Sequence, residues 1–328
     1  MKTTRIAFLL MMLIWGQLVA AGQNPPKGPL PITGQTPLQT LRLDLVPIRP
    51  EILERGRWEL TLFNSLTNRW NKTDRYLLDV EILQNIIGFS IGIGKDIEFA
   101  VMAPLISRSG GVLDPMIMRF HDRFGLGQAD RGEFPVNAIQ VSFVNNSGKE
   151  VVVFDNTDKG TIMGDVSLLA RHRLYGGQGW LRSLVWTALL RLPTATQREY
   201  YGSGGVDGAF SLASTHRSGP FYLYTTLGYG EYGSGSLFDI ELRPYQWTFF
   251  AAVEYSVSKK ISLIAQQLSN SGVAATFEGF SDPTHELILG VKHVVSPHLM
   301  LEYGIVENLF KFRNSVDFGL IFGLSCRY

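Results

Sequence analysis

The sequence predicts an all-β fold: a transmembrane, antiparallel, up-and-down β-barrel of about 12 strands in the outer membrane of a Gram-negative cell. Three observations lead to this prediction. The chain begins with an export signal, its strands alternate between apolar and polar residues, and its last strand ends on an aromatic residue, Tyr328. Such alternation is typical of strands that face lipid on one side and a polar lumen on the other.

Residues 1–21 have the pattern of a cleaved signal peptide. Lys2 and Arg5 supply the positive start, residues 6–19 are apolar, and small residues follow up to Ala21, after which we expect cleavage. The alternative is an uncleaved anchor helix, which the short apolar stretch disfavours. No cysteine stands directly after this stretch, so the usual bacterial lipid anchor is excluded.

The composition suits a membrane barrel better than a soluble domain. Hydrophobic residues make up 45% of the chain and charged residues only 18%, whereas soluble domains carry roughly 25% charged residues. A net charge of +1 without a dense basic cluster excludes a nucleic-acid partner. With Cys326 as the only cysteine, and no metal-ligand spacing among the six histidines, we expect no disulfide, no metal and no other cofactor.

The last strand, residues 316–328, shows the alternation best. One phase is apolar and suits lipid: Phe318, Leu320, Phe322, Leu324, Cys326 and Tyr328. The other phase is mostly small or polar and suits a lumen: Asp317, Gly319, Ile321, Gly323, Ser325 and Arg327. Similar alternation recurs at 162–174, 181–192, 246–256, 285–294 and 299–307. A soluble β-sandwich would also alternate, but it would not explain the export signal, the low charge and the terminal tyrosine together.

No stretch of 18 apolar residues follows the signal, so the chain must cross a membrane as a closed barrel. The links between strands alternate in length. Short turns are expected at 94–95, 176–179, 217–220, 257–260 and 295–298, and longer links at 109–134, 194–207, 233–240, 270–284 and 308–314. With the chain end in the periplasm, these short turns also fall on the periplasmic side.

Two regions are less regular. Between residues 75 and 93 the apolar phase switches, which predicts a β-bulge near residues 84–86. Residues 139–145 and 150–155 form a short hairpin. If this hairpin crosses the membrane the barrel has 14 strands; if it projects outward the barrel has 12, which we favour.

Residues 110–131 contain the most specific motif: Gly110-Gly111, Leu113-Asp114, Ile117, Phe120-His121-Asp122, Phe124-Gly125-Leu126 and Arg131. Together with Gly56-Arg57-Trp58 and Gly164-Asp165, it resembles a Gram-negative family known as domain of unknown function 3187, over most of the mature chain. The sequence departs from the family at residues 33–37, where members tend to carry an Arg-Asn pair. The resemblance implies an outer-membrane barrel and brings no substrate or activity with it.

Within this motif the spacing predicts a short amphipathic helix in an outer loop, with Asp114 as cap, Pro115 in the first turn and Gly125 as stop. Its apolar stripe must bury against the inner wall of the mouth, a neighbouring loop or the lipid interface. The helix is either a constriction that folds inward or a structural lid, and only a constriction would make deletion of residues 114–124 raise conductance. The candidate gate residues are Asp114, Arg119, Phe120, His121, Asp122 and Arg123.

Charged residues on the inward phase are candidates for lining the lumen. They are Asp165, Arg171, Arg191, Glu254, Lys292, Glu302, Asp317 and Arg327. Because they carry both signs, they either form ion pairs across a partly packed barrel or line a narrow wet path. The proline-rich segment 22–56 is either a lumen plug or a periplasmic tail, and residues 57–328 form the barrel.

Three functions remain open. The leading one is a non-enzymatic, narrow channel or transporter for small molecules, with apolar solutes among the candidates. The second is an outer-membrane lipid hydrolase or acyl-modifying enzyme, for which Ser214 and His216 share a strand face without a third partner. The third is a structural or assembly barrel that binds a periplasmic partner through its N-terminal tail. The G-x-G-x-x-G match at residues 228–233 lacks a following helix, so these glycines are expected to reduce bulk on a strand and to open a loop.

The expected partners follow from the location. They are outer-membrane lipid and lipopolysaccharide, the barrel-assembly machinery through the last strand at Tyr328, and a small solute that the sequence does not name.

Overall fold

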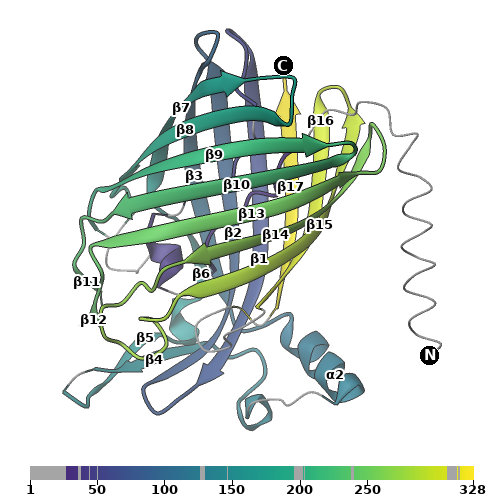
Figure 1. Ribbon diagram of the computed structural model, residues 1–328. Coiled ribbons are helices and arrows are strands. Elements are labelled where there is room, and N and C mark those ends of the chain that lie inside the picture. Colours follow the sequence, from purple (N-terminus) through teal and green to yellow (C-terminus); the bar gives the residue numbers. More distant parts are fainter. Residues whose placement is uncertain are drawn as a thin grey trace, which may run out of the picture.

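The computed structural model describes residues 27–35, 38–43, 45–49, 51–125, 130–145, 147–195, 202, 204–237, 240–308, 316 and 318–328. The expected signal peptide and Asp317 lie outside these residues. Twelve antiparallel strands form a closed barrel (Figure 1). In order they are β1 (Trp58–Lys72), β2 (Tyr76–Gly92), β3 (Ile97–Ser109), β7 (Val166–Gly176), β8 (Leu181–Leu192), β9 (Asp207–Ser218), β10 (Phe221–Glu231), β13 (Tyr245–Ser256), β14 (Ile261–Asn270), β15 (Thr284–Ser296), β16 (Leu299–Asn308) and β17 (Phe318–Arg327). Pairing of β17 with β1 closes the barrel, which confirms the predicted fold class.

A short helix, η1 (Gln39–Leu41), precedes β1. The remaining elements lie in the links at one end of the barrel, the lower end in Figure 1. They are α2 (Asp114–Phe124), η2 (Arg131–Glu133), β4 (Gln140–Val144), β5 (Glu150–Phe154), η3 (Asn156–Asp158), β6 (Gly160–Met163), β11 (Ser236–Leu237) and β12 (Ile240–Glu241). Strand β4 pairs with the first residues of β2, and β5 pairs with β4 alone. The hairpin is therefore an extension at this end and not a further pair of barrel strands, which confirms 12 strands over 14.

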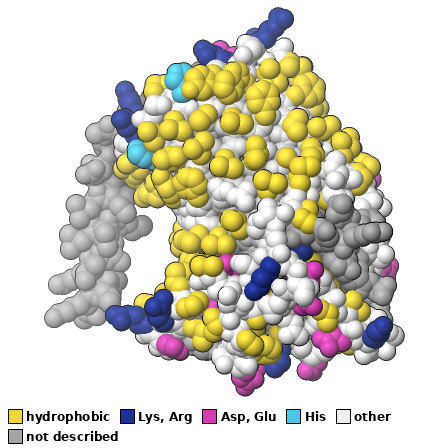
Figure 2. Space-filling model, turned by 180° about the vertical axis from the view of Figure 1, so that it is seen from behind, with side chains coloured by type: hydrophobic (Ala, Val, Ile, Leu, Met, Phe, Trp, Pro, Cys, Tyr) yellow, Lys and Arg dark blue, Asp and Glu magenta, His cyan; other side chains and the backbone are white. Residues whose placement is uncertain are grey.

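Burial follows the predicted alternation along the barrel strands. In β17, Leu320 and Phe322 are 40% and 39% exposed, whereas Ile321 between them is 4% exposed. Figure 2 shows hydrophobic side chains over much of the wall, with Asp and Glu gathered towards the lower end. This distribution fits a wall that faces hydrocarbon between two polar rims. None of the helices in the described ranges is long and apolar enough to cross a membrane.

The bulge expected near residues 84–86 is wrong. Strand β2 keeps one register against β1 and β3 along its whole length. Even-numbered residues of β2 therefore face inward throughout, from Tyr76 through Gly88. The apolar phase switches because the interior beside the first half of β2 is itself apolar, as described below. The inward residues are therefore apolar in the first half of the strand, whereas the outward residues are apolar in the second half. The backbone pairing stays the same throughout.

Candidate functional site

The lumen is the candidate functional site, and the described residues between 27 and 53 occupy it. We call these residues the strap. Its side chains Leu30 and Ile32 are fully buried, although the strap belongs to no barrel strand. In Figure 1 the described part of the strap, drawn in purple, is seen against the barrel wall. Its contacts, which follow, are with side chains of the inward phase.

The first part of the strap is held by polar side chains of the wall. The amides of Lys27 and Gly28 donate to the carboxylate of Glu254 at 3.1–3.2 Å. Gln266 binds Leu30 on both sides, accepting from its amide and donating to its carbonyl, each at 2.9 Å. These bonds satisfy backbone groups that would otherwise be buried without partners.

The end of the strap is held by an ion-pair network around Glu98, whose side chain is fully buried. Arg49 of the strap donates to Glu98 at 2.7 Å, and Arg171 of the wall donates to its other oxygen at 2.8 Å. The amide of Leu53 adds a third bond at 2.9 Å. Arg49 also pairs with Glu59 at 2.6 Å. Buried charges of both signs thus neutralise one another between strap and wall.

Glycines in the wall leave room for leucines of the strap. A Cβ atom on Gly228 would lie 2.0 Å from Leu45 Cδ1, so that only glycine fits beside this leucine. Leu30 lies in the same way against Gly290 and Gly304, which face each other across β15 and β16. The sequence predicted that Gly228 reduces bulk on a strand; its neighbour in that space is the strap.

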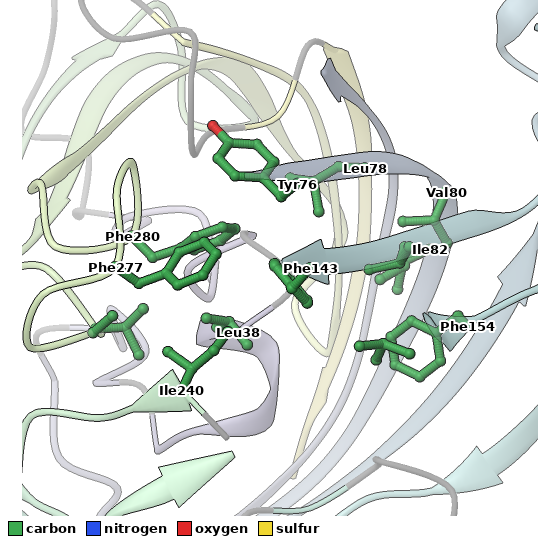
Figure 3. Packing of buried hydrophobic residues seen from close by; sticks show 14 of the residues in the cluster. Leu38, Tyr76, Leu78, Val80, Ile82, Phe143, Phe154, Ile240, Phe277 and Phe280 are labelled. Atoms are coloured by element: carbon green, nitrogen blue, oxygen red, sulfur yellow. The ribbon is translucent and has the colours of Figure 1, made fainter. Parts of the chain in front are cut away.

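An apolar cluster fills the lumen towards the outer end. Tyr76 of β2 and Phe143 of β4 pack with Phe277 and Phe280 of the β14–β15 link, with ring centroids 5.3–6.5 Å apart. Leu38 of the strap lies in the same cluster (Figure 3). The strap is therefore held by polar contacts near the end of the barrel with the short turns and by apolar contacts near the opposite end.

The structure places most of the candidate lumen residues in buried ion pairs or hydrogen bonds. Asp165 pairs with Arg191 at 3.2 Å, and Lys292 pairs with Glu302. Asp165 also accepts from the amide of Ala195 at 2.9 Å, so it fixes the β8–β9 link. The described candidates within the barrel are at most 5% exposed: Asp165, Arg171, Arg191, Glu254, Lys292 and Glu302.

The end of the barrel with the short turns is rich in charge. Arg327, whose side chain is 38% exposed, pairs with Glu51 at 3.2 Å and with Glu59 at 2.9 Å. A cavity of about 520 Å³ lies beside these residues, and its lining includes Arg57 and Lys95.

Arg69 and Glu98 were not among the residues predicted to line the lumen, although both lie on the inward phase. Arg69 is 1% exposed, and its Nε and both Nη atoms have no hydrogen-bond partner among the described residues. Strict alternation from Glu59 along β1 would have placed Arg69 on the inward phase. The position of a charged residue within an apolar stretch would have indicated Glu98.

The structure confirms a helix at Asp114–Phe124 that ends at Gly125, whose φ of 66° is left-handed. The predicted cap is wrong: Asp114 is inside the helix, and its carboxylate accepts from Asn68 at 2.8 Å instead. Glu81 of β2 satisfies the amide of Leu113, at 2.8 Å, just before the helix. This acceptor comes from a distant strand, which local spacing does not reveal.

Helix α2 is attached to the outward side of the wall. Ser65 and Thr67 contact Gln35 of the strap, so odd-numbered residues of β1 face inward and Asn68 faces outward. Glu81 lies on the outward phase of β2 by the same alternation. The candidate gate residues of α2 would therefore have to move to reach the lumen, and a gating role for them stays a prediction.

Neither a metal site nor a serine hydrolase site is apparent within the described residues. No group of three or more His, Cys, Asp or Glu side chains there could hold a metal ion. Ser214 and His216 do meet, with Oγ and Nε2 2.9 Å apart, but Nδ1 of His216 has no hydrogen-bond partner in the described part of the chain. The carboxylate that orients a catalytic histidine is thus missing from that position.

Comparisons with known proteins agree with the fold. The model of the family described as Protein of unknown function (DUF3187) matches residues 6–328. The structure is similar to an outer membrane channel from Pseudomonas putida F1, with 12% identity, a TM-score of 0.56, and coverage of 87% of this chain and 100% of that chain. It is also similar to the NanC porin, with 8% identity, a TM-score of 0.47, and coverage of 81% and 98%. At such identities the first likeness supports the barrel fold alone. A search of curated proteins gives no match.

Proposed function

We propose a function for this chain, which belongs to the DUF3187 family: it is a narrow, non-enzymatic channel for small molecules in the outer membrane, closed at rest by its own strap. In this proposal residues 22–56 are a plug and residues 57–328 are the channel wall. Cleavage after Ala21 and recognition of the last strand by the barrel-assembly machinery stay predictions.

One observation carries the proposal: polar and charged side chains of the wall hold the backbone of the strap, and they lie among apolar wall side chains such as Phe250 and Ile288. Glu254, Gln266 and Glu98 contact the strap through side chains that water can equally well solvate. Apolar contacts alone would fix the strap more simply, because buried ion pairs add little net stability. Displacement of the strap would leave a wettable path, which is what a channel requires.

The test is a reducible lock between strap and wall. In a Cys326→Ser background, Leu45→Cys with Gly228→Cys places two thiols where a leucine now touches a glycine. Purified protein in planar bilayers is expected to show few openings when oxidised and parental openings after reduction. Leu45→Cys alone, in the same background, is the matched control and is expected to be insensitive to reductant.

Equal conductance of the oxidised and reduced double variant, with the disulfide verified by mass spectrometry, would overturn the proposal that the strap closes the channel. Absence of conductance in the parent, in the reduced double variant and in a variant lacking residues 27–53 would overturn the channel function itself.

A further inference from the structure

Part of the apolar side of α2 is uncovered in the structure. Of the apolar residues in and beside the helix, Leu113 and Ile117 are buried. Met116, Phe120 and Phe124 are 40%, 52% and 63% exposed, and they follow one another at intervals of four residues. The rings of Phe120 and Phe124 lie 4.7 Å apart. An apolar stripe of this kind on a helix requires a partner in the native environment.

The attachment of α2 determines which environment the stripe meets. The helix begins beside Glu81 and Asn68, on the outward side of β1 and β2, which is the side that faces lipid farther along these strands. Arg131 closes this attachment, donating to Asn68 at 2.9 Å. In Figure 1, α2 stands outside the outline of the barrel near its outer end. The stripe is therefore next to the rim of the lipid-facing wall and away from the lumen.

Charge is arranged around the stripe in a definite way. At 3.6 residues per turn, Arg119 and Arg123 flank the stripe on one side, whereas Asp122 lies on the opposite face of the helix. Lys72, at the same end of β1, lies with its ammonium 5.1 Å from the ring of Phe134. Basic residues beside exposed aromatic residues match a membrane surface that carries phosphate groups above acyl chains.

We infer that α2 is an interfacial anchor that binds the phosphorylated lipid of the outer leaflet. Met116, Phe120 and Phe124 enter the region of the acyl chains, and Arg119 and Arg123 bind lipid phosphate groups. This site fixes the rim of the barrel to the membrane surface and is independent of whether the strap gates the lumen. The contacts with Glu81 and Asn68 hold the start of the helix in this position.

Tryptophan at position 120 tests the depth of the helix. Phe120→Trp protein, reconstituted in nanodiscs that contain lipopolysaccharide and brominated phospholipid, is expected to add a blue-shifted emission that bromine quenches, relative to the emission of the parent. Val152→Trp is the matched control, because Val152 is 54% exposed on the projecting hairpin. Its added emission is expected to be red-shifted and unquenched. Equal quenching at both positions, or none at position 120, would overturn insertion.

The charged part of the site is tested with Arg119→Gln combined with Arg123→Gln. This variant is expected to bind lipopolysaccharide several-fold more weakly than the parent does, while binding to zwitterionic phosphatidylcholine is unchanged. Equal affinity of parent and variant for lipopolysaccharide would overturn the phosphate contacts. Disulfide-linked dimers of Phe120→Cys protein in a Cys326→Ser background would instead show a second copy of the chain on the stripe, and would overturn the lipid assignment.

Discussion

Glutamine at position 98 is expected to loosen the strap and to destabilise the barrel by about 3–5 kcal/mol, the usual cost of removing one partner from a buried ion pair. Glu98→Gln removes the negative charge between Arg49 and Arg171 and weakens the acceptor of the Leu53 amide. Both guanidinium groups stay buried, so the loss is not recovered by solvent. The stability is measured by unfolding in urea, with the folded fraction read from the heat-dependent electrophoretic mobility of the barrel. Planar-bilayer recording measures the channel openings, which are expected to become more frequent.

Asp96→Asn is the control for Glu98→Gln. Asp96 pairs with Arg173 at a site where both side chains are about one third exposed, so its loss is expected to cost less than about 1 kcal/mol. Arg49→Gln changes the strap alone and keeps the experiment informative if Glu98→Gln does not assemble. Equal stability and equal openings in Glu98→Gln, Arg49→Gln and parent would show that this network does not hold the strap.

Alanine at position 228 is expected to displace the strap, and alanine at position 230 is expected to leave it in place. The added methyl group at Gly228 meets Leu45 Cδ1 at 2.0 Å, whereas at Gly230 its nearest neighbour is 3.5 Å away. The two glycines lie on the same face of β10, two residues apart. Overpacking predicts a loss of about 1–3 kcal/mol for Gly228→Ala, together with more frequent openings.

Limited proteolysis separates strap movement from general loosening in the glycine pair. Release of the strap in Gly228→Ala is expected to expose residues 27–53 to protease, while the barrel stays resistant. The shared face and the equal change in side-chain volume make Gly230→Ala a strict control. Identical cleavage and conductance of the two variants would contradict the role of the Leu45 contact.

Local alternation was enough to predict the wall because each barrel strand has one environment on each side. The phase of β17 was read from Phe318, Leu320 and Phe322 against Gly319 and Ile321, and the burial of these residues agrees with it. The same reasoning failed in β2, where Tyr76 and Leu78 are apolar and yet face inward. Alternation identifies the side of a strand only when the lumen is polar, and the interior beside these two residues is not.

The candidate site was harder to predict than the wall. The charged residues on the inward phase were predicted because alternation along a strand can be read from neighbouring residues. Their partners were not predicted, since Arg49 and Glu98 are 49 positions apart in the sequence and Lys27 and Glu254 are 227 positions apart. The helix at residues 114–124 was predicted from its spacing. Its outward attachment depends on Glu81 and Asn68, which local spacing does not connect to it.

The sequence by itself determined the class of fold, the lipid-facing phase and the helix at residues 114–124. Each of these depends on periodicity within a dozen neighbouring residues, and for a strand between lipid and lumen that periodicity is set by solvation alone. Only the tertiary structure decided that residues 27–53 fill the lumen, that the outer end holds an apolar cluster and that α2 turns outward. These arrangements arise from contacts between segments far apart in the chain, whose free energy depends on shape and on paired charges that no local pattern contains.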